Sequence, residues 1–244
     1  MTAAKRQRAR RGSGEQLREE IVAAAKKLLA EAGNADKVSI RAVADAVGVT
    51  PPSIYLHFAD KDELLNAVVF DVFSELDAAM LQGADGLDEP LARLRAFGMS
   101  YIRFAVGHPE HYRLATMDPC ASPPAVDEVL ATSAFAHFQA TVRECMDAGI
   151  FTPGDPLPIT LDLWAAAHGI ASLIIAKPYL PWGELDVVAD RILCAAAMGH
   201  VVAGFIGPQP EPADIMAWLA TQRRTKPAAK PAVRTVRQRP RSRG

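Results

Sequence analysis

The chain has 244 residues, of which 50% are hydrophobic, and a formal net charge of −1 at pH 7. This composition excludes an intrinsically disordered chain and allows one or two domains with buried cores. Three scattered cysteines exclude a disulfide framework and a cysteine-type zinc site. No uninterrupted apolar run reaches the roughly 18 residues of a membrane helix, and no apolar segment of a secretory signal follows the basic N-terminus. We therefore expect a cytoplasmic protein with no membrane partner.

The charge is unevenly distributed. Residues 1–11 carry five Lys or Arg and no acid, and residues 223–244 carry nine and no acid, so the body between them is strongly acidic. We expect residues 1–14 to form a basic flexible arm and residues 223–244 a basic disordered tail. Each could be only a solvated end, or it could add contacts to phosphate.

Residues 15–62 predict three helices. Ser13-Gly-Glu-Gln16 resembles a capping box, and the helix that follows should end at Gly33-Asn34. Ser39 can cap a second helix over Ile40–Val47, which Gly48 stops, and Thr50 can cap a third that ends near His57. A second capping box at Asp60-Lys-Asp-Glu63 opens a long linking helix from residue 60 to about 82.

The remaining body, residues 83–222, also has a helical pattern. Segments rich in Pro or Gly separate the helices that we expect at residues 88–107, 109–117, 124–149, 158–177, 184–206 and 212–222. No convincing period-2 strand is present. The sequence therefore predicts an all-α fold: an N-terminal three-helix domain containing a helix-turn-helix, and a C-terminal helical domain for ligand binding and dimerisation.

The Val47-Gly48-Val49 turn between the second and third helices is typical of a helix-turn-helix. Pro51 and Pro52 occupy the first turn of the third helix, where a missing N–H is tolerated. Their apolar rings could contact thymine methyl groups in the major groove, or they could only rigidify the helix start.

The stretch from Ser39 to Leu65 resembles the TetR family signature, most specifically in Ile54-Tyr55-x-His57-Phe58 and Lys61-x-Glu63-Leu64-Leu65. The resemblance covers about residues 15–70 and implies that the third helix enters the major groove. It implies a base contact for Arg41, and recognition positions at Pro51, Pro52 and Ser53, next to the cap Thr50. It implies phosphate contacts for Ser39, Tyr55, His57 and Lys61. The second proline departs from many relatives, so their operator sequences cannot be transferred.

Physical chemistry agrees with these implied roles. Arg41 can donate two hydrogen bonds to a guanine. Lys61 lies in the first turn of a helix, where the dipole disfavours a cation, and a phosphate would compensate. The alternatives are an exposed surface lysine at position 61 and a half-buried aromatic at position 55.

Small residues fill two late helical segments, Ala195–Gly204 and Ala165–Ala171. Small side chains let helices approach closely, so we expect a four-helix interface between two subunits that bind a palindromic operator. The alternative is tight packing within one subunit.

The C-terminal half also carries a set of aromatic and polar residues that could line an effector pocket. Its segments His108–Ala115 and Trp164–Gly169 resemble one group of TetR C-terminal domains, the one with Trp-x-x-x-His-Gly. An apolar pocket with one or two polar groups would suit a lipophilic effector, although each of these residues could equally belong to the core. The expected lining is Phe97, Tyr101, Phe104, Tyr112, Met117, Phe138, Trp164 and His168, with Phe135 in the same set.

These patterns favour a sequence-specific transcriptional repressor released by a small, largely apolar effector. An enzyme is disfavoured because the phosphate-loop, dinucleotide and nucleophile motifs are missing, and no cofactor or metal is expected. His108 and His111 could share a metal on one helix face but lack a third ligand. A third hypothesis is a DNA-binding protein whose basic tail makes the dominant, non-specific contacts.

Overall fold

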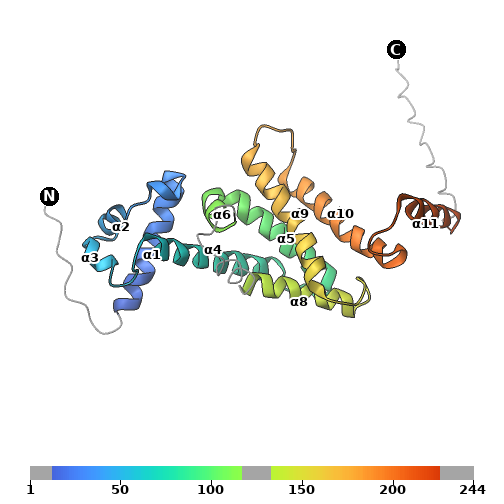
Figure 1. Ribbon diagram of the computed structural model, residues 1–244, viewed down its shortest axis with the longest axis horizontal. Coiled ribbons are helices and arrows are strands. Elements are labelled where there is room, and N and C mark those ends of the chain that lie inside the picture. The colour runs from blue at the N-terminus through green and yellow to red at the C-terminus, as the bar shows by residue number, and fades with distance from the viewer. Residues whose placement is uncertain (1–12, 117–132, 226–244) are drawn as a thin grey trace, which may run out of the picture. The chain divides into compact units, whose positions relative to one another are not determined.

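A computed structural model describes residues 13–116 and 133–225, and within these ranges all regular elements are helical. The predicted all-α fold is confirmed. In chain order (Figure 1) the elements are α1 (Ser13–Ala32), the 3-10 helix η1 (Ala35–Lys37), α2 (Ile40–Val47), α3 (Pro51–Ile54), α4 (Lys61–Gly83), α5 (Pro90–Gly107), α6 (Pro109–Thr116), α8 (Ser133–Asp147), α9 (Pro156–Ala176), α10 (Leu185–Ile206) and α11 (Pro212–Thr225).

The chain divides into two compact units, Met1–Val201 and Val202–Gly244. Within the first unit, α1 packs against α2 and α4. Its buried residues Ile21, Ala25 and Leu29 are spaced by four, so they form one helix face toward the core. Ile54 and Phe58 are buried on the other side of this small core. The result is a compact three-helix head carried by α4.

Local caps fix both ends of α2 and the start of α4 as predicted, whereas Thr50 precedes α3 without a side-chain capping bond. The Ser39 hydroxyl accepts a hydrogen bond from the Ala42 backbone N–H at 3.2 Å, and Gly48 ends α2 with a left-handed φ of 77°. At the start of α4, the Asp60 carboxylate accepts from the Glu63 N–H at 2.8 Å. Glu63 in turn accepts from the Ala59 N–H at 2.5 Å. The predicted capping box is therefore present, with its return bond displaced by one residue.

Several predicted boundaries need correction. The helix expected from residue 158 starts at Pro156, because Asp155 caps it and Pro158 falls in the first turn, where its missing N–H costs nothing. Similarly, α5 starts at Pro90 rather than residue 88. The third helix is shorter than expected: α3 ends at Ile54 and a turn continues to His57.

Other boundaries differ at the ends of the described ranges. α1 includes Ser13 instead of starting after it, and α11 extends to Thr225, past the expected end at residue 222. η1, capped by Asn34, was not predicted. The arm before Ser13, the tail after Thr225, Met117 and residues 124–132 of an expected helix lie outside the described residues.

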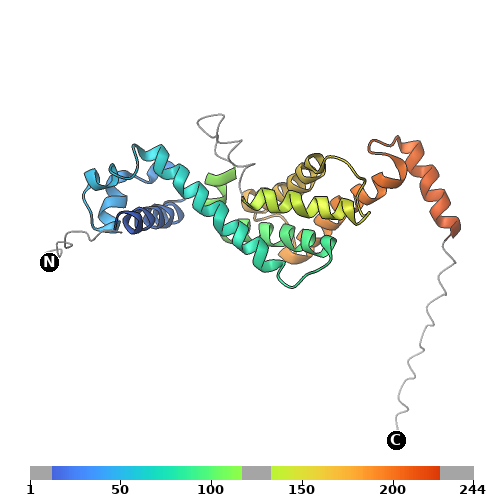
Figure 2. The ribbon, with the colours of Figure 1, turned by 90° about the horizontal axis from the view of Figure 1, so that it is seen from below.

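The C-terminal helices of the first unit form a layered bundle around α5. α5 packs against α4, α8 and α9, and α8 also packs against α4 and α9 (Figure 2). A hydrogen bond of 2.8 Å joins the exposed His137 of α8 to the buried Asp77 of α4. Ion pairs of Arg95 with Asp190 and of Arg103 with Asp186 hold α10 to α5.

Helices α9 and α10 are long and apolar enough to span a membrane by length and composition alone, with mean hydropathies of 1.6 and 1.5. The expectation that no segment is long and apolar enough for a membrane helix is therefore corrected for these two helices. Isolated charged residues such as Asp162 and Asp190 interrupt the apolar runs, but the mean hydropathy of each helix stays within the range of membrane helices. Most residues of each helix are only partly buried or are exposed in the single chain: α10 buries only Val188, Ala189 and Leu193.

We predict that Gly48→Ala destabilises the protein by about 1 kcal/mol, because a β-carbon disfavours the left-handed backbone at this turn. Gly107→Ala is the matched control. Gly107 lies at the end of α5 with open space around it, so alanine there should raise stability slightly. The free energy of unfolding in urea measures both changes, and a stability gain for Gly48→Ala would contradict the role of the turn.

Candidate nucleic-acid interface and effector site

The residues predicted to contact DNA lie on the surface of the N-terminal head. Arg41, Pro52 and Tyr55 are exposed, with 53% of Tyr55 accessible. Ser39 and Thr50 are also exposed, and the remaining predicted positions, Pro51, Ser53, His57 and Lys61, are partly buried. The buried residues of the same segment, Ile54 and Phe58, face the core. The α2–α3 turn therefore presents the predicted set outward.

Hydrogen bonds within the head leave donors free for phosphate. The Ser39 oxygen accepts the capping bond, so its own hydroxyl hydrogen stays available. Thr50 makes no capping bond to the backbone; its hydroxyl lies 3.0 Å from that of Ser53. Within residues 13–116 and 133–225, the Lys61 amine makes one long bond of 3.5 Å, to the Asp36 carbonyl, which leaves most of its donor capacity unused there.

Sequence reasoning missed Leu56, which is 83% exposed between Tyr55 and His57. This exposed side chain offers apolar surface next to the predicted phosphate contacts at Tyr55 and His57. The signal was present: Ile54 and Phe58 are one helical turn apart and buried, which directs the residues between them outward.

In the C-terminal bundle, four predicted effector residues form one hydrogen-bonded chain. The Trp164 indole N–H donates to the Tyr101 hydroxyl at 3.1 Å, and the Tyr101 and Tyr112 hydroxyls are 3.0 Å apart. The Tyr112 hydroxyl lies 2.6 Å from Nδ1 of His168. Burial raises the pKa of both tyrosines and lowers that of His168. All four groups are therefore uncharged at neutral pH.

Two apolar cavities lie beside this chain. One of about 40 Å³ is lined by Phe73, Met80, Tyr101, Ala134, Phe135, Phe138 and Trp164. A larger one of about 180 Å³ lies among α5, α8, α9 and α10. From the predicted set, Tyr101, Phe138 and Trp164 line the small cavity and Phe138 alone lines the large one. Phe97 is buried in the core and Phe104 packs near His108, and neither lines a cavity.

The two histidines considered for a metal have other surroundings. Their rings stack with centroids 5.9 Å apart, and His111 bonds through Nε2 to the Lys26 carbonyl oxygen at 3.0 Å. In the described part of the chain, no group of three or more His, Cys, Asp or Glu residues could hold a metal ion. The Nδ1 atom of His111 is buried and has no hydrogen-bond partner in the structure.

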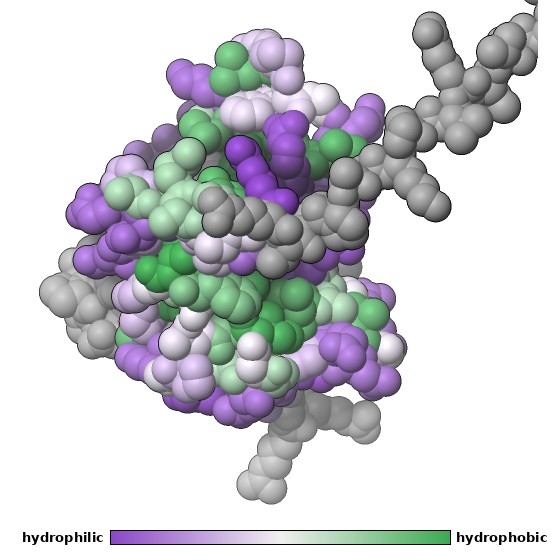
Figure 3. Space-filling model, turned by 90° about the vertical axis from the view of Figure 1, so that its right-hand side faces the viewer, coloured by the Kyte–Doolittle hydropathy of each residue, from purple (hydrophilic) through white to green (hydrophobic). Residues whose placement is uncertain are grey.

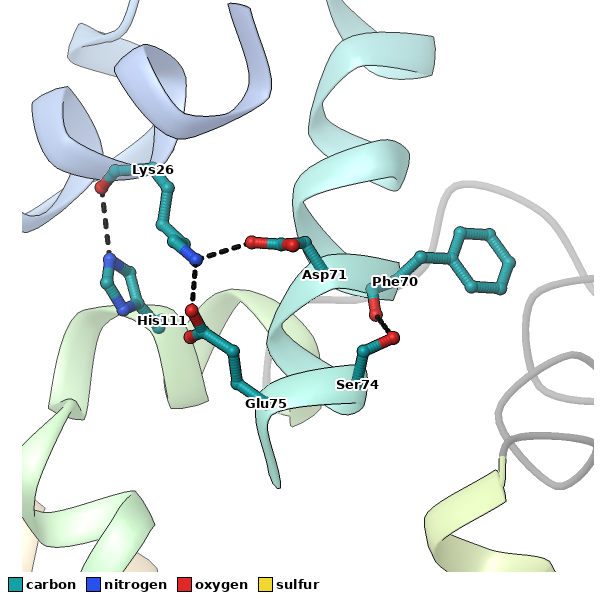
Figure 4. A network of polar contacts seen from close by, with 6 residues as sticks. All are labelled: Lys26, Phe70, Asp71, Ser74, Glu75 and His111. Atoms are coloured by element: carbon teal, nitrogen blue, oxygen red, sulfur yellow. Dashed lines mark hydrogen bonds and ion pairs between the residues drawn. The ribbon is translucent and has the colours of Figure 1, made fainter. Parts of the chain in front are cut away.

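His111 belongs to a polar joint between the head and the bundle. Figure 4 shows the Lys26 amine of α1 directed at two carboxylates of α4, and His111 of α6 directed at the Lys26 carbonyl. The amine pairs with Asp71 and, at 2.6 Å, with Glu75. Burial alone would lower the pKa of Lys26, but the bonds to Asp71 and Glu75 outweigh it and raise that pKa. Three helices therefore meet at a single lysine.

Comparison with known proteins identifies both halves of the chain. Residues 21–68 match the family model for bacterial regulatory proteins of the tetR family, and residues 94–196 match the tetracyclin repressor-like C-terminal domain. Together these matches span more than half of the chain. It belongs to the TetR family and is a DNA-binding transcriptional regulator.

Solved structures share the fold. A protein of unknown function from Rhodococcus sp. RHA1 is 29% identical, with a TM-score of 0.65 over 76% of this chain and 95% of that one. A TetR family transcription regulator from Marinobacter aquaeolei VT8 is 18% identical, with a TM-score of 0.59 over 77% of this chain and 98% of the other. No curated protein matches significantly.

Membership of the TetR family accounts for the apolar helices α9 and α10 and for the general class of activity. The C-terminal match includes α9 and most of α10, so their membrane-like length belongs to a domain of this regulator family. TetR family regulators bind DNA, act as dimers with small-molecule effectors and are generally not enzymes. The family is one of soluble bacterial regulators.

We predict that stability falls on acidification and that His168→Asn reduces the fall. Burial lowers the pKa of His168 below its ordinary 6.5, so the unfolded chain takes up a proton before the folded chain does. Asparagine can keep an acceptor near Nδ1 but does not titrate. Thermal melting between about pH 7.5 and about pH 5 tests this, and an equal loss in both proteins would contradict it.

Proposed function

We propose that the protein is a cytoplasmic, dimeric repressor that leaves a palindromic operator when a small, largely apolar effector binds the C-terminal bundle. The observation that carries the proposal is the rigid presentation of Arg41, Pro52 and Tyr55 around the Gly48 turn. An exposed arginine beside an apolar helix start matches the chemistry of base edges in the major groove.

The DNA contacts divide into two kinds. Arg41 donates to guanine, and Pro51, Pro52 and Ser53 follow it along the base edges. The residues that surround them bind the backbone and set the register of the head: Ser39, Thr50, Tyr55, His57 and Lys61. The exposed Leu56 lies among these and adds apolar contact.

The dimer is proposed to form through α9 and α10. A β-carbon added at Gly169 or Gly199 would meet no atom within 4 Å, so packing within one subunit does not require these glycines. Exposed apolar residues lie on the same helices, Leu161 and Leu173 on α9 and Val187 and Met198 on α10. Apolar side chains also gather on the face of the molecule shown in Figure 3. A second copy would cover the apolar surface and use the close approach that glycine permits.

Release is proposed to pass through α6. Tyr112 of this helix bonds to His168 in the effector region, while the neighbouring His111 bonds to α1 of the head. A ligand that shifts Tyr112 therefore shifts the contact that holds α1. The effector acts by favouring the arrangement in which the two heads no longer fit the half-sites.

The test is binding to the DNA upstream of the protein's own gene. We expect salt-resistant, sequence-specific binding, and Arg41→Ala should weaken it by about 10- to 100-fold. Arg143→Ala, which removes an exposed arginine of α8, is the control and should bind as the wild type does. A gel-shift titration measures all three proteins, and binding without sequence preference would reject the proposal.

A second prediction tests the dimer. Gly199→Leu should leave the subunit folded, because there is open space around this position, but should weaken dimerisation and operator binding by at least about tenfold. Gly107→Leu introduces the same side chain at another open helical glycine and serves as the control. Sedimentation velocity gives the dissociation constant, and a dimer of unchanged strength would place the interface elsewhere.

A further inference from the structure

The two cavities of the C-terminal bundle share one wall, Phe138 of α8. Their linings are also adjacent along two other helices. On α5, Gly98 lines the large cavity and Tyr101, one turn later, lines the small one; on α9, the neighbouring residues Leu163 and Trp164 divide in the same way. Phe138 therefore lies at the shared boundary of two neighbouring cavities.

The small cavity contains one hydroxyl with defined hydrogen-bonding capacity. Trp164 can only donate, so Tyr101 accepts its N–H. At the other end, a phenol is the better donor and an imidazole nitrogen the better acceptor, so Tyr112 donates to the neutral His168. Tyr101 then donates to Tyr112 at 3.0 Å, with Nδ1 of His168 at 3.4 Å as a longer alternative, so its hydrogen stays within the chain of bonds. Its oxygen retains one lone pair, and its only hydrogen is already used.

This capacity selects the polar group of a ligand. Of the four hydrogen-bonded residues, only Tyr101 and Trp164 line the small cavity, and the indole N–H of Trp164 is already engaged. A ligand that reaches Tyr101 must therefore donate a hydrogen bond. A carbonyl or carboxylate would find no free donor there.

The charges around the large cavity exclude an ionised ligand. Its remaining lining is apolar except for the Arg95–Asp190 ion pair and the Cys194 thiol. Together the arginine and the aspartate carry no net charge, so the lining offers an ionised ligand no net opposite charge. An ionised group would lose its hydration without compensation.

We propose that the joined space binds an elongated, uncharged, apolar molecule with a single terminal hydroxyl. The apolar body fills the large cavity, Phe138 turns aside, and the hydroxyl donates to Tyr101. This inference rests on the proposed effector-released regulator and names the chemical class of its effector.

Three matched compounds test the ligand class with the full chain and without DNA: 1-octanol, 1-methoxyheptane and octanoate. Isothermal titration calorimetry should show 1-octanol binding roughly three- to tenfold more tightly than the ether of equal length, which lacks the donor. Octanoate should not bind at concentrations that saturate with 1-octanol. Equal affinity for alcohol and ether, or preference for octanoate, would overturn the proposal.

Variants test the two residues that define the site. Tyr101→Phe should abolish the preference for alcohol over ether, because the accepting oxygen is removed. Phe138→Ala, with Phe138→Leu as the milder substitution, should tighten 1-octanol binding by at least threefold, whereas Phe104→Leu should not change it. Unchanged affinity in both Phe138 variants would show that the cavities do not join.

The outcomes separate this inference from the proposed function. If 1-octanol binds with the expected selectivity but does not release the operator, the ligand class is supported and release by that class is rejected. If the operator is bound specifically but 1-octanol is not bound, the regulator assignment stands and the ligand class is overturned.

Discussion

Helix α4 packs against α1 at one end and against α5 and α8 at the other, and this shared packing joins the reading head to the effector bundle. Leu64 and Val68 are buried beneath the head, while Leu76 and Met80 are buried in the bundle. Because one continuous helix supplies both cores, neither can rotate about it without breaking apolar contacts. The Lys26 pairs with Asp71 and Glu75 add polar contacts in the middle, between a largely buried amine and two partly exposed carboxylates.

Two adjacent residues of α6, His111 and Tyr112, connect the effector region to the head. His111 faces the Lys26 carbonyl and Tyr112 faces His168, so a short helix contacts both the head and the effector region. Among the described residues, the buried Nδ1 of His111 has no hydrogen-bond partner, so this contact between head and bundle contains an unsatisfied polar atom. A change in the hydrogen bonds of Tyr101 would reach the head through only two residues, Tyr112 and His111.

Local rules made much of the head predictable. Gly48, Ser39 and the Asp60 capping box act through backbone bonds over four residues or fewer, and the structure has each of them. The same rules failed near Pro158, because the segment of residues 152–158 was expected to separate two helices, whereas Pro158 lies in the first turn of α9. Burial of Ile54 and Phe58 leaves the predicted contact residue Tyr55 exposed between them.

The effector region was less predictable, since cavities depend on packing between helices far apart in the sequence. The predicted lining includes all four members of the hydrogen-bonded chain: Tyr101, Tyr112, Trp164 and His168. Their spacing in the sequence does not distinguish them from Phe97, which is an ordinary core residue. The large cavity is lined by Leu193 and Ala197 of α10, whose apolar character also suits dimerisation. The apolar composition of α10 therefore predicts that other helices cover it, but not which ones. The ion pairs mark the side of α10 that faces α5, and the open space at Gly199 indicates the side proposed for a partner subunit.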